Sequence, residues 1–142
     1  MSAFISFAEA STTFFFKSGL LFKILDIPGI LVSAFSNTAF EEVYKTLKNQ
    51  FNIGRLRLMK SIPKTCLTWH CDDTKRIHYP ISTQDGCLMI IEDEVHHMKT
   101  GTCWFTDTRF YHSQFNGSEA DRIHMVMCVV DKDYKSSEIP QV

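Results

Sequence analysis

The stretch TWHCDDTKRIHYP, from Thr68 to Pro80, contains two histidines, two aspartates, an arginine and a lysine. Such polarity is typical of a solvated loop. The flanking runs, RLRLM (Arg55–Met59) and CLMII (Cys87–Ile91), instead resemble strands that enter a core. A polar stretch between core strands predicts a fold with a wet interior, such as a small β-barrel that holds a ligand in its mouth.

Short β-like runs separated by turn residues continue on both sides of this stretch. The separators include Pro63-Lys64, Asp85-Gly86 and Asn116-Gly117-Ser118, which are residue types that favour turns. This spacing predicts a mainly β fold, a double-stranded β-helix or cupin-like jelly roll, with a short N-terminal helical section. The predicted strands are Arg55–Lys60, Cys66–Asp72, Arg76–Ile81, Cys87–Glu92, Thr102–Thr106, Phe110–Phe115 and Arg122–Val130.

The helical section is predicted at residues 38–50. There Phe40, Val43 and Leu47 recur on one face of a helix, which is the pattern of a helix packed against a core. Residues 14–24 are expected to form one or two short strands.

The length of 142 residues corresponds to one domain. We therefore expect a single domain over residues 1–142. It would consist of a supporting section, 1–54, and a jelly-roll core, 55–131.

The composition, with 44% hydrophobic and 22% charged residues, is that of a soluble globular protein. A net charge of −1 gives no electrostatic reason to expect a nucleic acid or an anionic membrane as partner. The five cysteines include no CxxC pair, which favours a reducing, cytoplasmic location over a disulfide framework or a thiolate zinc site. Charged residues interrupt the apolar N-terminal stretch, so no membrane span is expected.

Pairs of polar side chains recur at positions i and i+2 of the predicted strands, where they share a face. His70 and Asp72 form one pair, Arg76 and His78 form a second, and Arg122 and His124 form a third. His112 lies on a further strand, between aromatic residues. Two imidazoles and one carboxylate are the donor set of non-haem iron(II) oxygenases, because they leave three adjacent positions of an octahedral ion open. This pattern predicts a metal site made by His70, Asp72 and His112.

Arg122 follows ten residues after His112 and opens the last predicted strand. Its guanidinium is always charged and can hold a carboxylate through two parallel hydrogen bonds. An HxD pattern alone is weak evidence, because it arises easily by chance. Its combination with a distant histidine and then an arginine, all on β-like segments, is much more specific.

As a set, these residues resemble the aspartyl/asparaginyl β-hydroxylase family of 2-oxoglutarate- and iron(II)-dependent oxygenases. The resemblance covers about residues 55–131. The shared elements are His70, the R-x-H of Arg76 and His78, Gly101 before Trp104-Phe105, His112 in an F-x-H-like context, the turn Asn116-Gly117, and Arg122.

The resemblance implies a role for each polar side chain. The cofactors would be Fe(II), 2-oxoglutarate and O₂, and the products would include succinate and CO₂. The substrate would be an amino-acid residue of a protein or peptide, such as Asp or Asn, or a free amino acid. By this resemblance, iron would be bound by His70, Asp72 and His112. Arg122 would bind the distal carboxylate of 2-oxoglutarate, and His78 would contact its carboxylate near the metal. Arg76 would bind the substrate.

Two other functions stay open at this point. A cupin-like metal-binding protein or metalloenzyme without cosubstrate predicts that Arg122 tolerates replacement by leucine. A non-catalytic jelly-roll binding module predicts that iron and 2-oxoglutarate leave the thermal stability unchanged. The adjacent histidines His96 and His97 follow the acidic run IEDE and are expected in a turn. They are not expected to form a metal site, because adjacent residues on a strand point to opposite faces and do not chelate together.

Overall fold

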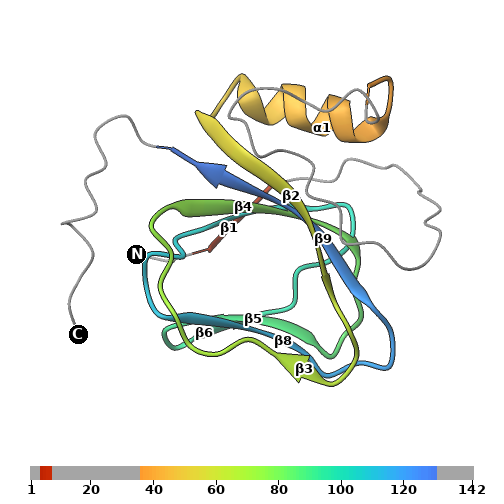
Figure 1. The fold of residues 1–142 in the computed structure, drawn as a ribbon, viewed down its shortest axis with the longest axis vertical. Coiled ribbons are helices and arrows are strands. Elements are labelled where there is room, and N and C mark those ends of the chain that lie inside the picture. Colours follow the sequence, from red (N-terminus) through yellow and green to blue (C-terminus); the bar gives the residue numbers. More distant parts are fainter. Residues whose placement is uncertain (1–3, 8–35, 131–142) are drawn as a thin grey trace.

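Two antiparallel sheets face each other in the computed structural model, which describes residues 4–7 and 36–130 (Figure 1). The larger sheet has the strand order β1-β7-β4-β9-β2, and the smaller has the order β3-β8-β5-β6. From β2 onward most connections cross from one sheet to the other, as in a jelly roll. The predicted fold class is confirmed. The elements are β1 (Phe4–Phe7), α1 (Ala39–Lys48), β2 (Ile53–Ser61), β3 (Thr65–Cys66), β4 (Lys75–Ser82), β5 (Cys87–Ile91), β6 (Glu94–His96), β7 (Cys103–Thr106), β8 (His112–Asn116) and β9 (Arg122–Val129).

One predicted strand, Cys66–Asp72, is wrong over most of its length. Regular pairing ends with β3, and beyond it only an isolated bridge joins His70 to His112. The chain here leaves the sheet and turns towards β4, so its backbone groups are hydrogen-bonded at separate points. These bonds are Leu67 N to Gln114 O at 2.9 Å, His70 N to His112 O at 3.2 Å, and Asp72 N to Thr108 O at 2.8 Å.

Two short strands were not expected at their positions. β6 forms a hairpin with β5 where a turn was predicted around His96. β1 pairs with β7 at the edge of the larger sheet. Residues 14–24, predicted as strands, lie outside the described residues.

The helix α1 confirms the predicted helix and lies over the outer face of the larger sheet (Figure 1). Its buried residues are Phe40, Tyr44 and Leu47. They join the main hydrophobic core together with fully buried side chains of the sheet such as Leu56 and Met127. The main apolar core therefore lies between the helix and the sheet.

The opposite face of the same strands is polar and faces the smaller sheet. On β9, Met125 and Met127 belong to the core under the helix, whereas Arg122 and His124 are buried on the other face. The alternation on β4 is the same, with Ile77 in the core and His78 on the inner face. The central strands thus bury both faces, which explains how a polar stretch can lie between core strands.

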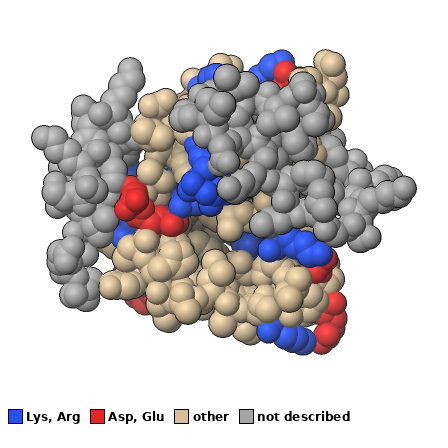
Figure 2. All heavy atoms as spheres, in the orientation of Figure 1, with Lys and Arg blue, Asp and Glu red and all other residues tan. Residues whose placement is uncertain are grey.

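Charges of both signs are interspersed on the face seen in Figure 2. Ion pairs such as Lys60–Asp121, at 2.6 Å, connect neighbouring segments. All five cysteines are free thiols. Within residues 4–7 and 36–130, no helix has the length and apolar character needed to cross a membrane.

Candidate metal centre and active site

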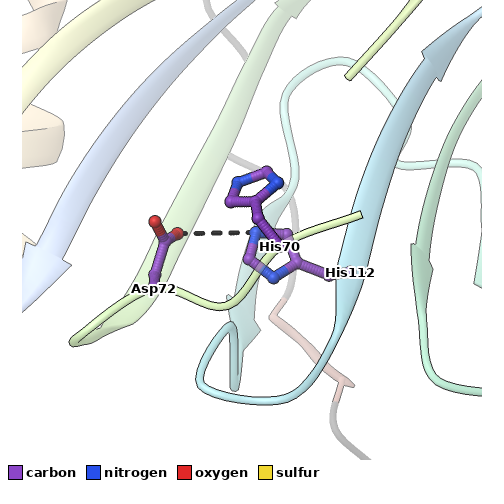
Figure 3. Close-up of side chains that lie close together, drawn as sticks. All are labelled: His70, Asp72 and His112. Carbon is purple, nitrogen blue, oxygen red and sulfur yellow. Dashed lines mark ion pairs between the residues drawn. The ribbon is translucent and has the colours of Figure 1, made fainter. Parts of the chain in front are cut away.

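Three predicted ligands, His70, Asp72 and His112, come together at the edge of the smaller sheet. Figure 3 shows His112 projecting from β8, while His70 and Asp72 approach from the segment that precedes β4. One donor atom from each residue lies within 4.8 Å of the other two. The imidazole rings of the two histidines have centroids 4.3 Å apart. The β-bridge between His70 and His112 places the two rings side by side.

Both histidines use the same ring nitrogen to bond to the backbone. Nδ1 of His70 donates to the carbonyl oxygen of Thr68 at 2.7 Å, and Nδ1 of His112 donates to that of Phe110 at 3.0 Å. A carbonyl oxygen only accepts, so Nδ1 must carry the proton in each ring. In a neutral imidazole this leaves the Nε2 lone pair available, as in most histidines that bind metals.

The carboxylate of Asp72 is divided between two neighbours. Its Oδ1 forms an ion pair with an Nη nitrogen of Arg76 at 2.8 Å, and its Oδ2 lies 3.5 Å from Nε2 of His112. Burial alone would raise the pKa of Asp72, but the contact with His112 and the charge of Arg76 outweigh it and hold the pKa below its usual value. The carboxylate is therefore ionised at neutral pH, with one oxygen oriented towards the histidines.

This arrangement suits a divalent metal ion. Two Nε2 lone pairs and one anionic oxygen converge on a small region, and each donor group is oriented by a further hydrogen bond or ion pair. Mutually close acceptors repel one another unless a cation lies between them. Two imidazoles and one carboxylate also match the donor set of non-haem iron(II) sites.

The cluster borders a cavity of about 200 Å³ between the two sheets. Three arginines line this cavity, while Asp72 is the only acidic residue among the described residues that line it. The cavity is therefore suited to an anionic ligand. The lining residues are Arg57, Met59, Leu67, His70, Asp72, Arg76, His78, Met89, Thr108, His112, Gln114, Arg122 and Val126.

Arg122 lies in this cavity as a buried cation. It is only 4% exposed, and no carboxylate within residues 4–7 and 36–130 forms an ion pair with it. Burial lowers the pKa of Arg122 to about 10, so it remains protonated at neutral pH. A buried, protonated guanidinium without a counter-ion is costly in free energy. A ligand carboxylate would remove that cost.

His78 also faces the cavity, and it is 7% exposed. Neither of its ring nitrogens has a hydrogen-bond partner among the described residues. Burial, together with the positive charges of Arg122 and Arg76, holds the pKa of His78 well below its usual value. A neutral imidazole with both nitrogens unsatisfied can donate one hydrogen bond to a ligand and accept another.

Sequence reasoning did not single out Arg57, and it assigned no role to two further inner-face residues, Gln114 and His124. Arg57 and Gln114 line the cavity, and His124 contacts Arg122 from behind. For Arg57 a signal was present, because it alternates with apolar residues in RLRLM. The face that His124 shares with Arg122 was predicted, but its contact with Arg122 was not.

Four other polar or aromatic residues do not line this cavity: Trp69, Asp73, His96 and Trp104. Asp73 is exposed in the loop before β4. His96 lies on β6, where its ring is 5.5 Å from that of Trp104. Trp104 packs against a small apolar cluster formed by Met89, Ile91 and Met98. The side chain of Trp69 is 54% exposed.

Comparisons with known proteins identify the family of the chain. The sequence matches the family described as aspartyl/asparaginyl beta-hydroxylase over residues 33–132. An L-proline cis-4-hydroxylase of Rhizobium meliloti (strain 1021) is 26% identical over 91 residues. That match covers 60% of this chain and 31% of the relative, so the chain spans about a third of the relative's length.

Two solved structures are similar at low sequence identity. A cupin domain from Bordetella pertussis Tohama I has 12% identity and a TM-score of 0.46, with 54% of this chain and 81% of that chain covered. An oxidoreductase of the 2OG-Fe(II) oxygenase family from Burkholderia pseudomallei has 12% identity and a TM-score of 0.48, with 68% of this chain and 54% of that chain covered. The family match spans well over half of the 142 residues. The chain belongs to the aspartyl/asparaginyl beta-hydroxylase family.

Proposed function

We propose that the protein is an iron(II)- and 2-oxoglutarate-dependent dioxygenase that hydroxylates an amino acid. The observation that carries this proposal is one cavity that contains three converging metal donors and a buried guanidinium with no counter-ion among the described residues. Family membership supports the reaction class. Similarity to an L-proline cis-4-hydroxylase supports an amino-acid substrate, either free or as a residue of a peptide or protein.

In this proposal His70, Asp72 and His112 hold the iron. When bound, iron(II) and 2-oxoglutarate supply the oxidation of a substrate C–H bond by O₂, with release of succinate and CO₂. The protein contributes the orientation of the donors. The Nδ1–H bonds to Thr68 and Phe110 fix both rings, and the ion pair with Arg76 fixes the carboxylate.

The two carboxylates of 2-oxoglutarate would contact different residues. Arg122 would bind the distal carboxylate, since a guanidinium can donate two parallel hydrogen bonds to it. His78 would donate a hydrogen bond to the carboxylate nearer the metal. The low exposure of both side chains, 4% and 7%, would exclude water from these contacts and strengthen them.

Arg76 would face the substrate. It lines the cavity described above and also a second cavity of about 380 Å³, and Asp72 borders both. The Nε atom of Arg76 is buried and has no hydrogen-bond partner among the described residues. We therefore infer that substrate enters through the second cavity and that a substrate carboxylate contacts Arg76 beside the metal.

We also propose that residues 1–142 act as one oxygenase domain, in which 1–54 supports the jelly-roll core of 55–131. The free cysteines are compatible with action in the cytoplasm, which stays a prediction.

Succinate release provides the test of the reaction and of the substrate class. The purified protein, with iron(II), ascorbate and 2-oxoglutarate, would be incubated with L-proline, with other free amino acids, and with peptides that contain Asp or Asn. We expect one of these classes to stimulate succinate release and to gain one oxygen atom by mass spectrometry. The matched control is Asp72→Ala. If the protein binds iron but consumes no 2-oxoglutarate with any substrate class, the cupin-like alternative is favoured instead.

A further inference from the structure

A second buried histidine, His124, lies behind Arg122 on β9. It is 1% exposed and does not line the cavity. Its Nδ1 atom lies 3.0 Å from an Nη nitrogen of Arg122. Because the two residues are separated by two positions on one strand, both side chains point to the inner face of the sheet. His124 therefore contacts the group proposed to bind the cosubstrate without contacting the cosubstrate itself.

The chemistry of this contact determines the protonation state of His124. A guanidinium can only donate hydrogen bonds, so Nδ1 of His124 must be the acceptor. The imidazole is then neutral, with its proton on Nε2. Burial and the positive charge of Arg122 hold the pKa of His124 well below its usual value, in agreement with this assignment.

His124 also contacts His78. Their ring centroids are 5.8 Å apart, and the rings meet edge-on with an interplanar angle of 75°. His124 thus contacts both residues that would bind the two carboxylates of 2-oxoglutarate. These residues come from neighbouring strands, β4 and β9.

A role in packing alone does not explain a histidine here. The Nε2 atom of His124 is buried and has no hydrogen-bond partner among the described residues. An unsatisfied buried polar atom costs free energy, so an apolar side chain would pack at lower cost. What an apolar side chain would lose is the acceptor that orients the guanidinium of Arg122.

We propose that His124 is a positioning residue that holds Arg122, and through ring contact His78, in the orientation that binds 2-oxoglutarate. This inference rests on the proposed function. Without the acceptor, the guanidinium would be free to rotate away from the plane in which it meets a carboxylate. The consequence would be weaker cosubstrate binding at an unchanged metal site.

Three variants test this proposal. His124→Leu removes the acceptor, and His124→Asn keeps an acceptor oxygen in the place of Nδ1. His97→Leu is the matched control. It removes a half-buried histidine that does not line the cavity and whose Nδ1 is hydrogen-bonded to the carbonyl oxygen of Cys87.

We expect His124→Leu to raise the KM for 2-oxoglutarate roughly tenfold or more, because a hydrogen bond to a charged group contributes a free energy of that size. The kcat should change much less. His124→Asn should restore most of that loss, and His97→Leu should not change the KM.

A readout without turnover accompanies the kinetics. Thermal stabilisation by 2-oxoglutarate in the presence of Zn(II) should fall in His124→Leu and recover in His124→Asn, whereas stabilisation by Zn(II) alone should stay the same. Imidazole ¹⁵N shifts of the metal-free wild type should show His124 protonated on Nε2 only. A proton on Nδ1, or equal losses in the Leu and Asn variants, would overturn the proposal.

These results separate the inference from the function on which it rests. If the wild type neither binds nor consumes 2-oxoglutarate, the proposed function fails. If the wild type does both and His124→Leu retains the wild-type KM, only the positioning role of His124 is wrong.

Discussion

Hydrogen bonds at the site leave one atom of each key side chain available for a ligand. His70 and His112 donate from Nδ1 to backbone carbonyls, and Asp72 commits one oxygen to Arg76. The remaining Nε2 and carboxylate atoms face a common region. The ability of this site to bind a metal therefore depends on the fixed tautomers of the two histidines and on the orientation of the carboxylate, as well as on the residue types.

The buried charge of Arg122, which has no counter-ion within residues 4–7 and 36–130, leads to a prediction about stability. Replacement by methionine, Arg122→Met, should change the free energy of unfolding of the metal-free protein by less than about 1 kcal/mol, because removal of a buried charge offsets the loss of the hydrogen bond to Nδ1 of His124. The same variant should lose most of its affinity for 2-oxoglutarate. Urea denaturation of the metal-free protein measures the first effect, and cosubstrate titration measures the second.

Arg109 provides the matched control for that substitution. Its guanidinium pairs with Asp107 through two contacts, at 2.8 and 2.7 Å. Arg109→Met should therefore lower the free energy of unfolding by about 1 kcal/mol or more, since Asp107 loses its partner. A comparable loss in Arg122→Met would mean that Arg122 is a structural residue and would contradict our account.

Individual ligands were more predictable than the residues that orient them. The HxD pattern and the distant His112 predicted a cluster that the structure does bring together. The acceptor role of His124 could not be predicted, because it depends on the neighbouring guanidinium and on complete burial. Sequence spacing indicates which face a side chain occupies, whereas its tautomer depends on tertiary contacts.

Among the elements, the segment of residues 67–74 differs most from expectation. It carries two proposed ligands but forms a loop rather than a strand. Thr108, 1% exposed, holds this loop twice: its carbonyl accepts from Asp72 N, and its Oγ1 donates to Thr74 O at 2.8 Å. The sequence could not reveal this, because Thr108 and the loop are distant in the chain.

This contact predicts the effect of Thr108→Val, which removes the hydroxyl with little change in shape. We expect a stability loss of about 1 kcal/mol and an iron(II) affinity lowered by about tenfold or more, because the loop that orients Asp72 is loosened. Metal titration with a competing chelator measures the affinity.

Thr106→Val is the control for this prediction. Thr106 is also fully buried, and its Oγ1 donates to the carbonyl oxygen of Arg76 on β4 at 3.1 Å. That hydrogen bond holds a strand rather than the loop, so the control should lose stability but keep its iron affinity. Equal iron affinities in the two variants would count against a role of Thr108 in orienting Asp72.

At the scale of the whole molecule, the apolar core and the polar cavity lie on opposite faces of the larger sheet. α1 covers the apolar face, and the smaller sheet covers the polar face (Figure 1). The alternation of apolar and polar residues predicted two different faces on each strand. It could not show which face the helix covers, since that depends on the path of the chain in three dimensions.

Ligands that bind only the folded cavity should stabilise the protein. We expect a non-redox divalent metal together with 2-oxoglutarate, at a hundredfold excess over Kd, to raise the free energy of unfolding by about 2.7 kcal/mol for each independent site. Thermal denaturation with and without a chelator measures this effect. Arg122→Met should retain the contribution of the metal and lose that of 2-oxoglutarate. An unchanged melting temperature in the wild type would favour a non-catalytic binding module.

The most direct measurement for our central claim is an anaerobic titration with iron(II) and 2-oxoglutarate, followed by visible absorption. If His70, Asp72 and His112 hold the metal beside the carboxylate site, the wild type should develop the weak charge-transfer band of an iron–2-oxoglutarate complex. His112→Ala should show no band, while the control His97→Ala should show it in full. A band of wild-type intensity in His112→Ala, or none in wild type that has bound iron, would contradict the proposed centre.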